Sequence, residues 1–453
     1  MKRKSVIFIF WILLWQLAAM VVGSKLLLPS PVDTVRALFA LLADSQFYLD
    51  ALATIGRCIV AIILAMVLGF ILALASYRYR IVRDILSLPI SLFKAIPIMA
   101  VAIYMILLLS PGNVPILVCF VMGFPIVYTN LLAGLDNMDR SLLEMAQVYN
   151  ISSRRKLRLI YIPSLYPYFS SAMSLLAGMS WKALVTAEVL SIPKFSLGYE
   201  LMNAKYYLNT DVLFAYVFAI IAISVAFEKL VRYILNKTAA HSYNYSKVAK
   251  LKPEHRSNTV DSTEIGLESV SKSFGDKQVL NNFTLQIAPA KTTAIMAPSG
   301  FGKTTIARIL SGLENADSGT VKRPARVSYL FQEDRLLPWL NVYDNLAIVL
   351  DEADDDRIHE VLKTVGLDEE AWKLPGELSG GMSYRVAMAR TFIYDASFMI
   401  ADEPFRGLDE ETRDKAVRKL WKPGVSGKTV LLITHSQEDV KLADTIVNLQ
   451  IIG

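Results

Sequence analysis

Apolar residues are distributed unevenly along the chain. Up to about residue 235 they form six long runs, at 5–23, 52–76, 89–109, 114–134, 168–190 and 212–235. Because a helix needs about 20 apolar residues to cross a bilayer, each run predicts a membrane-spanning helix. After about residue 250 the apolar runs are short and are separated by polar turns, as in a soluble domain. The pattern therefore predicts a six-helix all-α membrane bundle at 1–236, a polar linker at 237–262 and a soluble domain at 263–453.

The composition agrees with a chain that is partly embedded in a membrane. Of the 453 residues 54% are hydrophobic and 19% are charged, whereas soluble chains average about 45–50% and about 25%. This excludes a disordered chain, a collagen-like fibre and a small disulfide scaffold. Cys58 and Cys119 fall inside apolar runs, where we expect buried free thiols. The first run is longer than the core of a secretory signal and no cleavage site follows it, so we expect a retained helix.

Basic residues are concentrated in alternate loops, which indicates the orientation of the helices. If the N-terminus is cytoplasmic, eleven Lys and Arg residues lie in cytoplasmic loops and four in outer loops. The cytoplasmic set is Lys2, Arg3, Lys4, Arg78, Arg80, Arg83, Arg140, Arg154, Arg155, Lys156 and Arg158, and the outer set is Lys25, Arg36, Lys194 and Lys205. This bias predicts a multi-pass protein of the cytoplasmic membrane whose N-terminus and C-terminal domain are cytoplasmic. It also accounts for the net charge of +6 without a nucleic-acid partner.

The loop at 135–167 is long and polar, and it has helical character of its own. Residues 141–148 favour a short helix, and the turn signal NISS at 150–153 ends it. Ser152 or Ser153 can then cap a second short helix. Taken alone, this pattern predicts a pair of amphipathic helices at the membrane surface.

Two charged residues fall inside the fifth predicted span. Lys182 and Glu188 are six positions apart, so they do not share a helix face and are not expected to pair with each other. Charged groups inside a membrane are costly and need partners or water. They could line the path of a solute or pair with other helices, and Lys182 could also extend to the interface. The sequence leaves these alternatives open.

A glycine-rich loop lies in the C-terminal domain. The run TTAIM at 292–296 predicts a strand, and APSGFGKTT at 297–305 leads into a helical pattern, which is the setting of a P-loop. The glycines would let backbone N–H groups surround phosphates at a helix N-terminus, the lysine would reach the β- and γ-phosphates, and Thr304 would supply a hydroxyl to Mg²⁺. Ala297 stands where the motif has its first glycine, which is suitable only if its φ is negative. The candidate ATP-binding residues are Ser299, Gly300, Gly302, Lys303, Thr304 and Thr305.

Two further apolar strands end in polar residues. The run at 397–401 is followed by Asp402 and Glu403, and the run at 428–434 by His435. Asp402 would hold Mg²⁺ through water, and Glu403 would orient and polarise the water that attacks the γ-phosphate. His435 would end a strand parallel to the carboxylate strand, where open α/β sheets bind their ligands. We therefore assign Glu403 and His435 as candidate catalytic residues.

The segment LSGGM at 378–382 precedes another predicted helix. A serine and two glycines at a helix N-terminus favour an anion, although the serine could equally be an ordinary cap. In order and spacing, the motifs over 264–453 resemble the ABC-type ATPases, whose signature has Gln where Met382 stands. The resemblance implies an α/β P-loop domain with a helical subdomain at 263–453. The resemblance implies ATP and Mg²⁺ as cofactors and gives the remaining roles: adenine stacking by Phe274, the Q-loop and a metal contact at Gln332, the D-loop at Gly407, Leu408 and Asp409, the switch histidine at His435, and the signature contact to ATP by Ser379, Gly380 and Gly381.

The loop at 141–163 resembles the EAA loop of bacterial importer permeases. Its matching positions are Glu144, Ala146, Ile160 and Pro163, and Asn150, which tolerates a left-handed turn, replaces the family's glycine. Short motifs, among them LPSP at 28–31 and LGY at 197–199, make most of 1–235 similar to permeases of the nitrate, sulfonate and taurine importer class. The resemblance implies that this loop, with Glu144, Ala146, Asn150 and Pro163, docks on the ATPase. We expect Gln332 and the segment 337–340 to touch it.

Together these resemblances imply a permease fused to its ABC-type ATPase. Such a half-transporter would hydrolyse ATP to import a small polar or anionic solute, such as a sulfonate, nitrate, taurine or a vitamin precursor. It would work as a homodimer with two ATP sites and would receive the solute from an external binding protein. Two alternatives remain. An ABC exporter is disfavoured by the short loops. A non-transporting ATP-binding regulator is supported only by Ala297, Met382 and Arg406, the last of which replaces the family's usual small D-loop residue.

Overall fold

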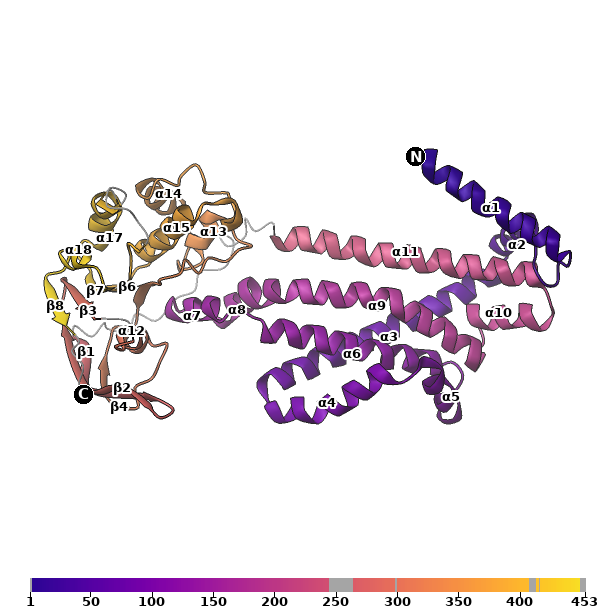
Figure 1. The fold of residues 1–453 in the computed structure, drawn as a ribbon, viewed down its shortest axis with the longest axis horizontal. Coiled ribbons are helices and arrows are strands. Elements are labelled where there is room, and N and C mark those ends of the chain that lie inside the picture. The colour runs from indigo at the N-terminus through magenta and orange to yellow at the C-terminus, as the bar shows by residue number, and fades with distance from the viewer. Residues whose placement is uncertain (1, 244–263, 298–299, 407–412, 415, 449–453) are drawn as a thin grey trace. The chain divides into compact units, whose positions relative to one another are not determined.

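The computed structural model describes residues 2–243, 264–297, 300–406, 413–414 and 416–448. The chain divides into two compact units (Figure 1). The first consists of Met1–Met138 and Ser164–Ala239, and the second of Asp139–Pro163 and Ala240–Gly453. The segment Asp139–Pro163, which we call the docking segment, thus lies between two helices of the first unit in sequence but packs within the second unit.

The first unit is entirely helical, and its long helices run alongside one another (Figure 1). Its helices are α1 (Lys2–Val22), α2 (Pro31–Ala43), α3 (Ser45–Arg78), α4 (Arg80–Ala95), α5 (Ile98–Leu108), α6 (Val114–Asp136), α9 (Ile162–Ser191), α10 (Leu197–Tyr206) and α11 (Thr210–Tyr243). Within the described residues, five helical segments are long and apolar enough to cross a membrane, and the bent pair α4–α5 makes six if it forms one span. The short helices α2 and α10 were not predicted.

The third predicted span, 89–109, is wrong as a single helix. The structure has α4 and α5 in its place, bent by 104°. Pro97 has no N–H to donate, and the residue before a proline is forced out of the helical region. Ile96 is accordingly extended, with φ −71° and ψ 128°.

The broken helix nevertheless traverses the bundle. Near the start of α4, Arg83 forms an ion pair of 2.9 Å with Asp136, the last residue of α6. After α5 ends at Leu108, only a short turn leads to the start of α6 at Val114. The pair α4–α5 therefore begins at one end of α6 and finishes at the other, as one broken span would.

Small residues let the helices of the bundle approach closely. A Cβ atom on Gly69 of α3 would lie 2.8 Å from the Val127 side chain of α6, and one on Gly123 of α6 would lie 2.5 Å from Leu176 of α9. Such small-residue contacts are the usual means of helix packing in membranes. Cys58 and Cys119 are buried free thiols at the same interface, as predicted.

The predicted linker at 237–262 begins too early. Helix α11 continues to Tyr243, because residues 237–243 include no proline or glycine, and two alanines among them favour continued helix. The rest of the predicted linker, 244–262, lies outside the described residues.

The second unit contains two sheets. A three-stranded antiparallel sheet has the order β2-β1-β4, with β1 (Ile265–Phe274), β2 (Lys277–Ile287) and β4 (Ser318–Lys322). A five-stranded parallel sheet has the order β5-β6-β7-β3-β8, with β3 (Thr292–Met296), β5 (Val327–Leu330), β6 (Phe398–Asp402), β7 (Thr429–Thr434) and β8 (Thr445–Asn448). Every residue of β5, β6 and β7 is buried, as expected for a parallel sheet covered on both faces.

Helices surround this parallel sheet. Helix α12 (Lys303–Ser311) follows β3, and α13 (Val342–Ala347), α14 (Asp355–Thr364) and α15 (Gly380–Ile393) pack on one another as a helical group between β5 and β6. A π-helical turn (Val417–Trp421) with α17 (Lys422–Val425) precedes β7, and α18 (Gln437–Val440) follows it. The docking segment contributes α7 (Arg140–Val148), α8 (Ser153–Lys156) and a π-helical turn (Leu157–Tyr161).

Candidate functional site

The motifs of the C-terminal domain converge on one edge of the parallel sheet. The glycine-rich loop follows β3, His435 follows β7, Glu403 follows β6 and Gln332 lies just beyond β5. These four strands are neighbours in the order β5-β6-β7-β3. Since parallel strands end at the same edge, segments far apart in sequence are brought together where α/β sheets bind ligands.

Glu403 is at the centre of a polar cluster. Its carboxylate lies 2.9 Å from Nδ1 of His435 and accepts a hydrogen bond of 3.3 Å from Nε2 of Gln332. Its φ is +51°, and its backbone N–H donates to the carbonyl of Ile433 in β7. A strained backbone that is fixed by a neighbouring strand is typical of functional positions. Arg406 also lies 3.8 Å from this carboxylate.

Asp402 precedes Glu403 and is buried at the end of β6. One carboxylate oxygen lies 3.4 Å from the Tyr329 hydroxyl. Burial, and then the adjacent Glu403 charge, raises the pKa of Asp402 to about 6. A cation near this carboxylate would oppose both effects.

The glycine-rich loop has the backbone that a phosphate cradle needs. Gly300 and Gly302 have φ values of +90° and +81°, which favour glycine. Ala297 is not among the described residues with positive φ, so alanine fits there without strain. Lys303 is buried and donates to the carbonyl of Ala297, while Thr304 and Thr305 lie in the first turn of α12, the former exposed. Ser299 lies outside the described residues.

The signature segment begins α15. The Ser379 hydroxyl accepts a hydrogen bond of 3.3 Å from the Met382 N–H, so the serine is a helix cap. Ser379, Gly380 and Gly381 are exposed, and added Cβ atoms on these two glycines would meet nothing within 4 Å. Phe274, at the end of β1, is 49% exposed. The predicted D-loop residues Gly407, Leu408 and Asp409 lie outside the described residues.

The docking segment is a helix–turn–helix whose turn follows the predicted pattern. Asn150 has φ +51°, the left-handed conformation for which asparagine is suited. The Ser152 side chain caps α8 by accepting from the Arg155 N–H, as predicted. Ala146 and Ile160 are fully buried in the core of the second unit, and Pro163 is also buried.

Glu144 of the docking segment joins two arginines of the C-terminal domain. Arg308 in α12 donates two hydrogen bonds, of 3.0 and 2.8 Å, to its two carboxylate oxygens. Arg335, shortly after Gln332, donates a third of 2.9 Å. The bonds from Arg308 outweigh partial burial and, with those from Arg335, hold the pKa of Glu144 below its ordinary value. Glu144 thus contacts both the helix after the glycine-rich loop and the segment after Gln332.

Three other side chains fix the docking segment. Tyr149 is fully buried and lies 3.1 Å from the Tyr329 carbonyl and 3.1 Å from the Thr391 hydroxyl. Arg155 donates to the carbonyls of Leu350 and Asp351. Trp339 donates to the Leu159 carbonyl at 2.7 Å, so the expected contact of 337–340 is confirmed through this residue. Gln332 instead bonds Glu403.

Arg390 connects the signature helix to the same region. It is buried in α15 and donates to the carbonyls of Asp334 and Arg335 at 2.8 and 2.9 Å. Arg335 has φ +45° and stacks its guanidinium 3.8 Å from the Phe331 ring centroid. A shift of the signature helix would therefore move the residue that holds Glu144.

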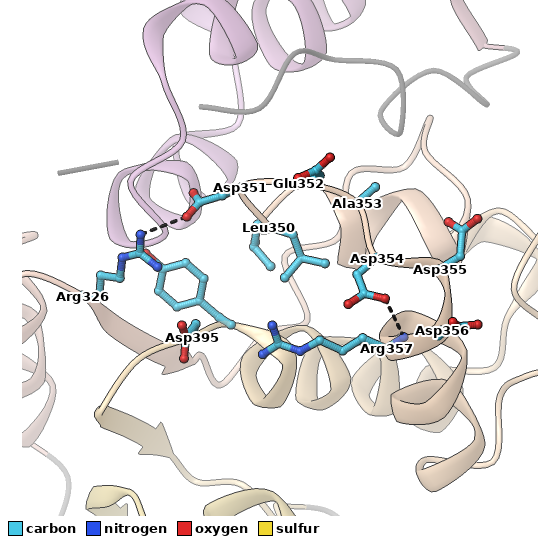
Figure 2. Close-up of a pocket in the computed structure, with 12 residues that line it drawn as sticks. Arg326, Leu350, Asp351, Glu352, Ala353, Asp354, Asp355, Asp356, Arg357 and Asp395 are labelled. Carbon is cyan, nitrogen blue, oxygen red and sulfur yellow. Dashed lines mark hydrogen bonds and ion pairs between the residues drawn. The ribbon is translucent and has the colours of Figure 1, made fainter. Parts of the chain in front are cut away.

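A separate cavity of about 630 Å³ lies beside the Arg155 contacts (Figure 2). Half of the residues that line it are Asp or Glu, and the lining also includes Arg326 and Arg357. Arg326 pairs with Asp351 at 2.9 Å, and Asp354 caps α14 at the Arg357 N–H. None of the sequence-predicted site residues lines this cavity, so it is distinct from the sheet-edge site.

In the first unit, Glu188 is paired with another helix. Its fully buried carboxylate accepts a hydrogen bond of 2.7 Å from Arg57 and one of 3.1 Å from Thr54, both in α3. The Gly198 N–H at the start of α10 donates to the same group. Arg57 also donates to the Lys194 carbonyl. Of the two alternatives for Glu188, lining a solute path or pairing with another helix, the structure therefore shows pairing with another helix.

We expect Arg57→Met to destabilise the bundle by about 3–5 kcal/mol, because it leaves a buried carboxylate without its cation. Thermal unfolding of the purified protein in detergent would measure the loss. Arg57→Met combined with Glu188→Met should recover part of it, and Arg36→Met, at an exposed arginine of α2, serves as the control. Equal melting of Arg57→Met and the unmodified protein would contradict a stabilising pair.

Three arginines that form contacts described above were not predicted from the sequence: Arg57, Arg308 and Arg335. Arg57 is a charged residue inside the second apolar run. It could have been identified by the same criterion as Lys182 and Glu188, a charge within a predicted span. The pairing of Arg308 and Arg335 with Glu144 could not be predicted. No local sequence feature indicates that an arginine will bind a glutamate 164 or 191 positions away.

Comparison with known proteins accounts for both units. Residues 65–239 match the family model described as the inner membrane component of binding-protein-dependent transport systems. Residues 280–406 match the family model of the ABC transporter. The first model covers the bundle from within α3 to α11, and the second covers the C-terminal domain from β2 to just beyond β6.

Individual relatives are ATP-binding proteins of import systems. An aliphatic sulfonates import ATP-binding protein from Yersinia pestis is 40% identical over 196 residues, covering 41% of this chain and 72% of the relative. The protein of the same description from Delftia acidovorans is 42% identical over 191 residues, covering 41% and 79%. A solved dimeric bacterial ABC transporter cassette is 28% identical, covers 41% of this chain and 94% of that chain, and has a TM-score of 0.37.

Proposed function

Because the chain belongs to the ABC transporter family and joins an importer-type permease to an ABC ATPase, we propose that it is an ATP-driven half-transporter for a small anionic solute. The observation that carries this proposal is the docking segment, which comes from between two membrane helices and packs within the ATPase unit. Through Glu144 and Tyr149 it contacts elements that flank the nucleotide site. Aliphatic sulfonates are the favoured solute class, because the relatives at about 40% identity are named for their import.

In the proposed site, the backbone of Gly300 and Gly302 surrounds the phosphates of ATP, and Thr305 is a further contact. The sequence motif adds Ser299 to this set. Lys303 balances the phosphate charge, and Phe274 offers an exposed ring for stacking on adenine. Glu403 orients and polarises the attacking water, and His435 and Gln332 hold its carboxylate in place.

The donor set also suits Mg²⁺, which prefers oxygen ligands. The Asp402 carboxylate, the exposed Thr304 hydroxyl and the Gln332 side chain would hold it. Bound there, the cation would neutralise charge on the β- and γ-phosphates. Asp402 would be ionised when it does so.

The working unit in this proposal is a homodimer. The signature residues Ser379, Gly380 and Gly381 are exposed at a helix N-terminus, and a second copy could present them to the γ-phosphate held by the first. Two copies would supply twelve membrane crossings and two ATP sites. An external binding protein would deliver the solute, consistent with the family description of the membrane component.

The proposed location is the cytoplasmic membrane, with the N-terminus and the ATPase in the cytoplasm. With α4–α5 taken as one span, the docking segment follows four crossings and the C-terminal domain six, so both would share the side of the N-terminus. The bias of eleven basic residues against four assigns that side to the cytoplasm.

Proteoliposomes that contain the purified protein and a sulfonate-binding protein would test this function. We expect ATP supplied at the nucleotide-binding face to drive accumulation of labelled ethanesulfonate. Vesicles without ATP are the control. If neither ethanesulfonate, taurine nor nitrate accumulates, the importer assignment for small anions is wrong.

Lys303→Ala is expected to abolish measurable nucleotide binding at micromolar ATP. Removing a charged hydrogen bond to phosphate costs about 1.5–3 kcal/mol, or about 10- to 100-fold in affinity. Titration with a fluorescent ATP analogue measures the loss. Lys291→Ala, at an exposed lysine before β3, is the matched control, and unchanged affinity in Lys303→Ala would contradict the P-loop assignment.

A further inference from the structure

One face of α9 differs from the lipid-exposed faces of the bundle. Positions 171, 175, 179, 182 and 186 are spaced by three or four and therefore form a single stripe. All are exposed or half-buried, and they are Ser171, Leu175, Met179, Lys182 and Thr186. Three of the five are polar, and one carries a charge.

The other faces of α9 are occupied within the same chain. Trp181 stacks on Phe227 of α11, Leu176 packs against Gly123 of α6, and Glu188 pairs with Arg57 of α3. The stripe is thus the one side of this helix that its neighbours in the described bundle leave uncovered.

Helix α3 provides an internal comparison. Between residues 59 and 71 its exposed side chains are all apolar: Ile59, Val60, Ile63, Leu64, Val67, Leu68, Phe70 and Ile71. This is the composition expected of a surface that faces lipid tails. The serine, lysine and threonine on the α9 stripe are not, so the stripe faces a more polar environment.

Lys182 has no partner among the described side chains. Its backbone carbonyl accepts from Thr186, but no carboxylate or other acceptor of the described residues binds its ammonium. It lies nine residues, or about 14 Å, before the end of α9 at Ser191. An unpaired ammonium at such a depth is tolerated where it faces water or an anion.

We propose that the α9 stripe lines the path of the solute between two copies of the chain, and that the Lys182 ammonium binds the anionic group of the solute. This inference rests on the proposed function, which supplies the second copy and the anionic solute. A sulfonate or a comparable oxyanion offers oxygens that a lysine binds as a point charge. A lipid phosphate has the same chemistry and is distinguished by experiment.

The first experiment asks whether the stripe meets water. Lys182→Cys and Leu64→Cys, in proteoliposomes, are treated with the water-soluble anionic thiol reagent sulfonatoethyl methanethiosulfonate. We expect Lys182→Cys to be modified and Leu64→Cys, on the apolar face of α3, to remain unmodified. The unmodified protein is the blank, because Cys58 and Cys119 are buried. An unreactive Lys182→Cys would overturn the inference.

The second experiment asks whether the charge recognises the solute. We expect Lys182→Met to lower ethanesulfonate uptake at limiting concentration by about 10- to 100-fold, the effect of a lost charged hydrogen bond. Lys182→Arg, which keeps the positive charge, should retain most uptake. Equal uptake by Lys182→Met and the unmodified protein would overturn the inference.

The outcomes separate the inference from the proposed function. If the unmodified protein takes up no ethanesulfonate, the proposed solute class is wrong, and so is the binding of that anion by Lys182. Thiol modification of Lys182→Cys would still show whether the α9 stripe is accessible to water. If activity of the unmodified protein, but not of Lys182→Met, rises with the phosphatidylglycerol content of vesicles and Lys182→Cys is unreactive, Lys182 binds lipid and the inference is wrong.

Discussion

Glu403→Gln is expected to reduce ATP hydrolysis by about 10²- to 10⁴-fold, the usual contribution of a positioned proton acceptor, while nucleotide binding persists. The amide keeps the size of the side chain and can still meet Gln332, but it cannot accept a proton from water or attract the His435 ring as a carboxylate does. Phosphate release by the purified protein measures hydrolysis, and a fluorescent ATP analogue measures binding.

Two variants make the test of Glu403 specific. Glu360→Gln removes an exposed carboxylate from α14 and should leave hydrolysis unchanged. His435→Ala removes the partner at 2.9 Å and should slow hydrolysis with Glu403 intact. Near-normal phosphate release by Glu403→Gln would show that this carboxylate does not serve the reaction.

Glu144→Arg is expected to eliminate ATP-dependent uptake while basal hydrolysis persists. The substitution replaces a carboxylate that accepts three hydrogen bonds from Arg308 and Arg335 with a third cation. Like charges at this distance repel, and the docking segment would lose its connection to both elements. Uptake and phosphate release, measured on the same proteoliposomes, would separate the two effects.

Charge exchange provides the control for Glu144. Combining Glu144→Arg with Arg308→Glu restores one opposite pair and should recover part of the uptake, which a merely misfolded variant would not do. Unimpaired uptake in Glu144→Arg alone would remove the coupling role from this residue.

The pH range for these assays follows from the direction of the Glu144 shift. Its pKa is lowered in the folded protein, so its stabilising contribution is fully present above the ordinary pKa of a glutamate. The contribution is lost only as the pH falls through the lowered value. Assays at neutral pH therefore compare the fully ionised pair with its variants.

The convergence of the candidate residues at the sheet edge was largely predictable, because each of them is marked locally in the sequence. A buried strand followed by Asp402 and Glu403, and another followed by His435, are visible as apolar runs with polar ends. Their convergence follows from the parallel sheet, in which all strand ends share one edge. The contact of Gln332 with Glu403 was not visible in this way, because 71 residues separate them.

The long apolar helices of the bundle were predictable from the sequence, but their contacts were not. Apolar length reveals a span, yet it does not show which charge in one span meets which in another, as with Arg57 and Glu188. The bend at Ile96 and Pro97 had a local cause, but a proline can also lie inside a continuous helix, as Pro125 does in α6. Tertiary packing decides between these outcomes.

Because the permease and the ATPase are parts of one polypeptide, the docking segment does not have to hold them together by itself. Helix α11 ends at Tyr243 and β1 begins at Ile265, so a short stretch of chain permanently tethers the ATPase to its permease. Tethered partners experience an effective concentration on the order of millimolar. We therefore expect weak docking to suffice for assembly. Substitutions that would release an ATPase on a separate chain should be tolerated here if Glu144 keeps its bonds to Arg308 and Arg335.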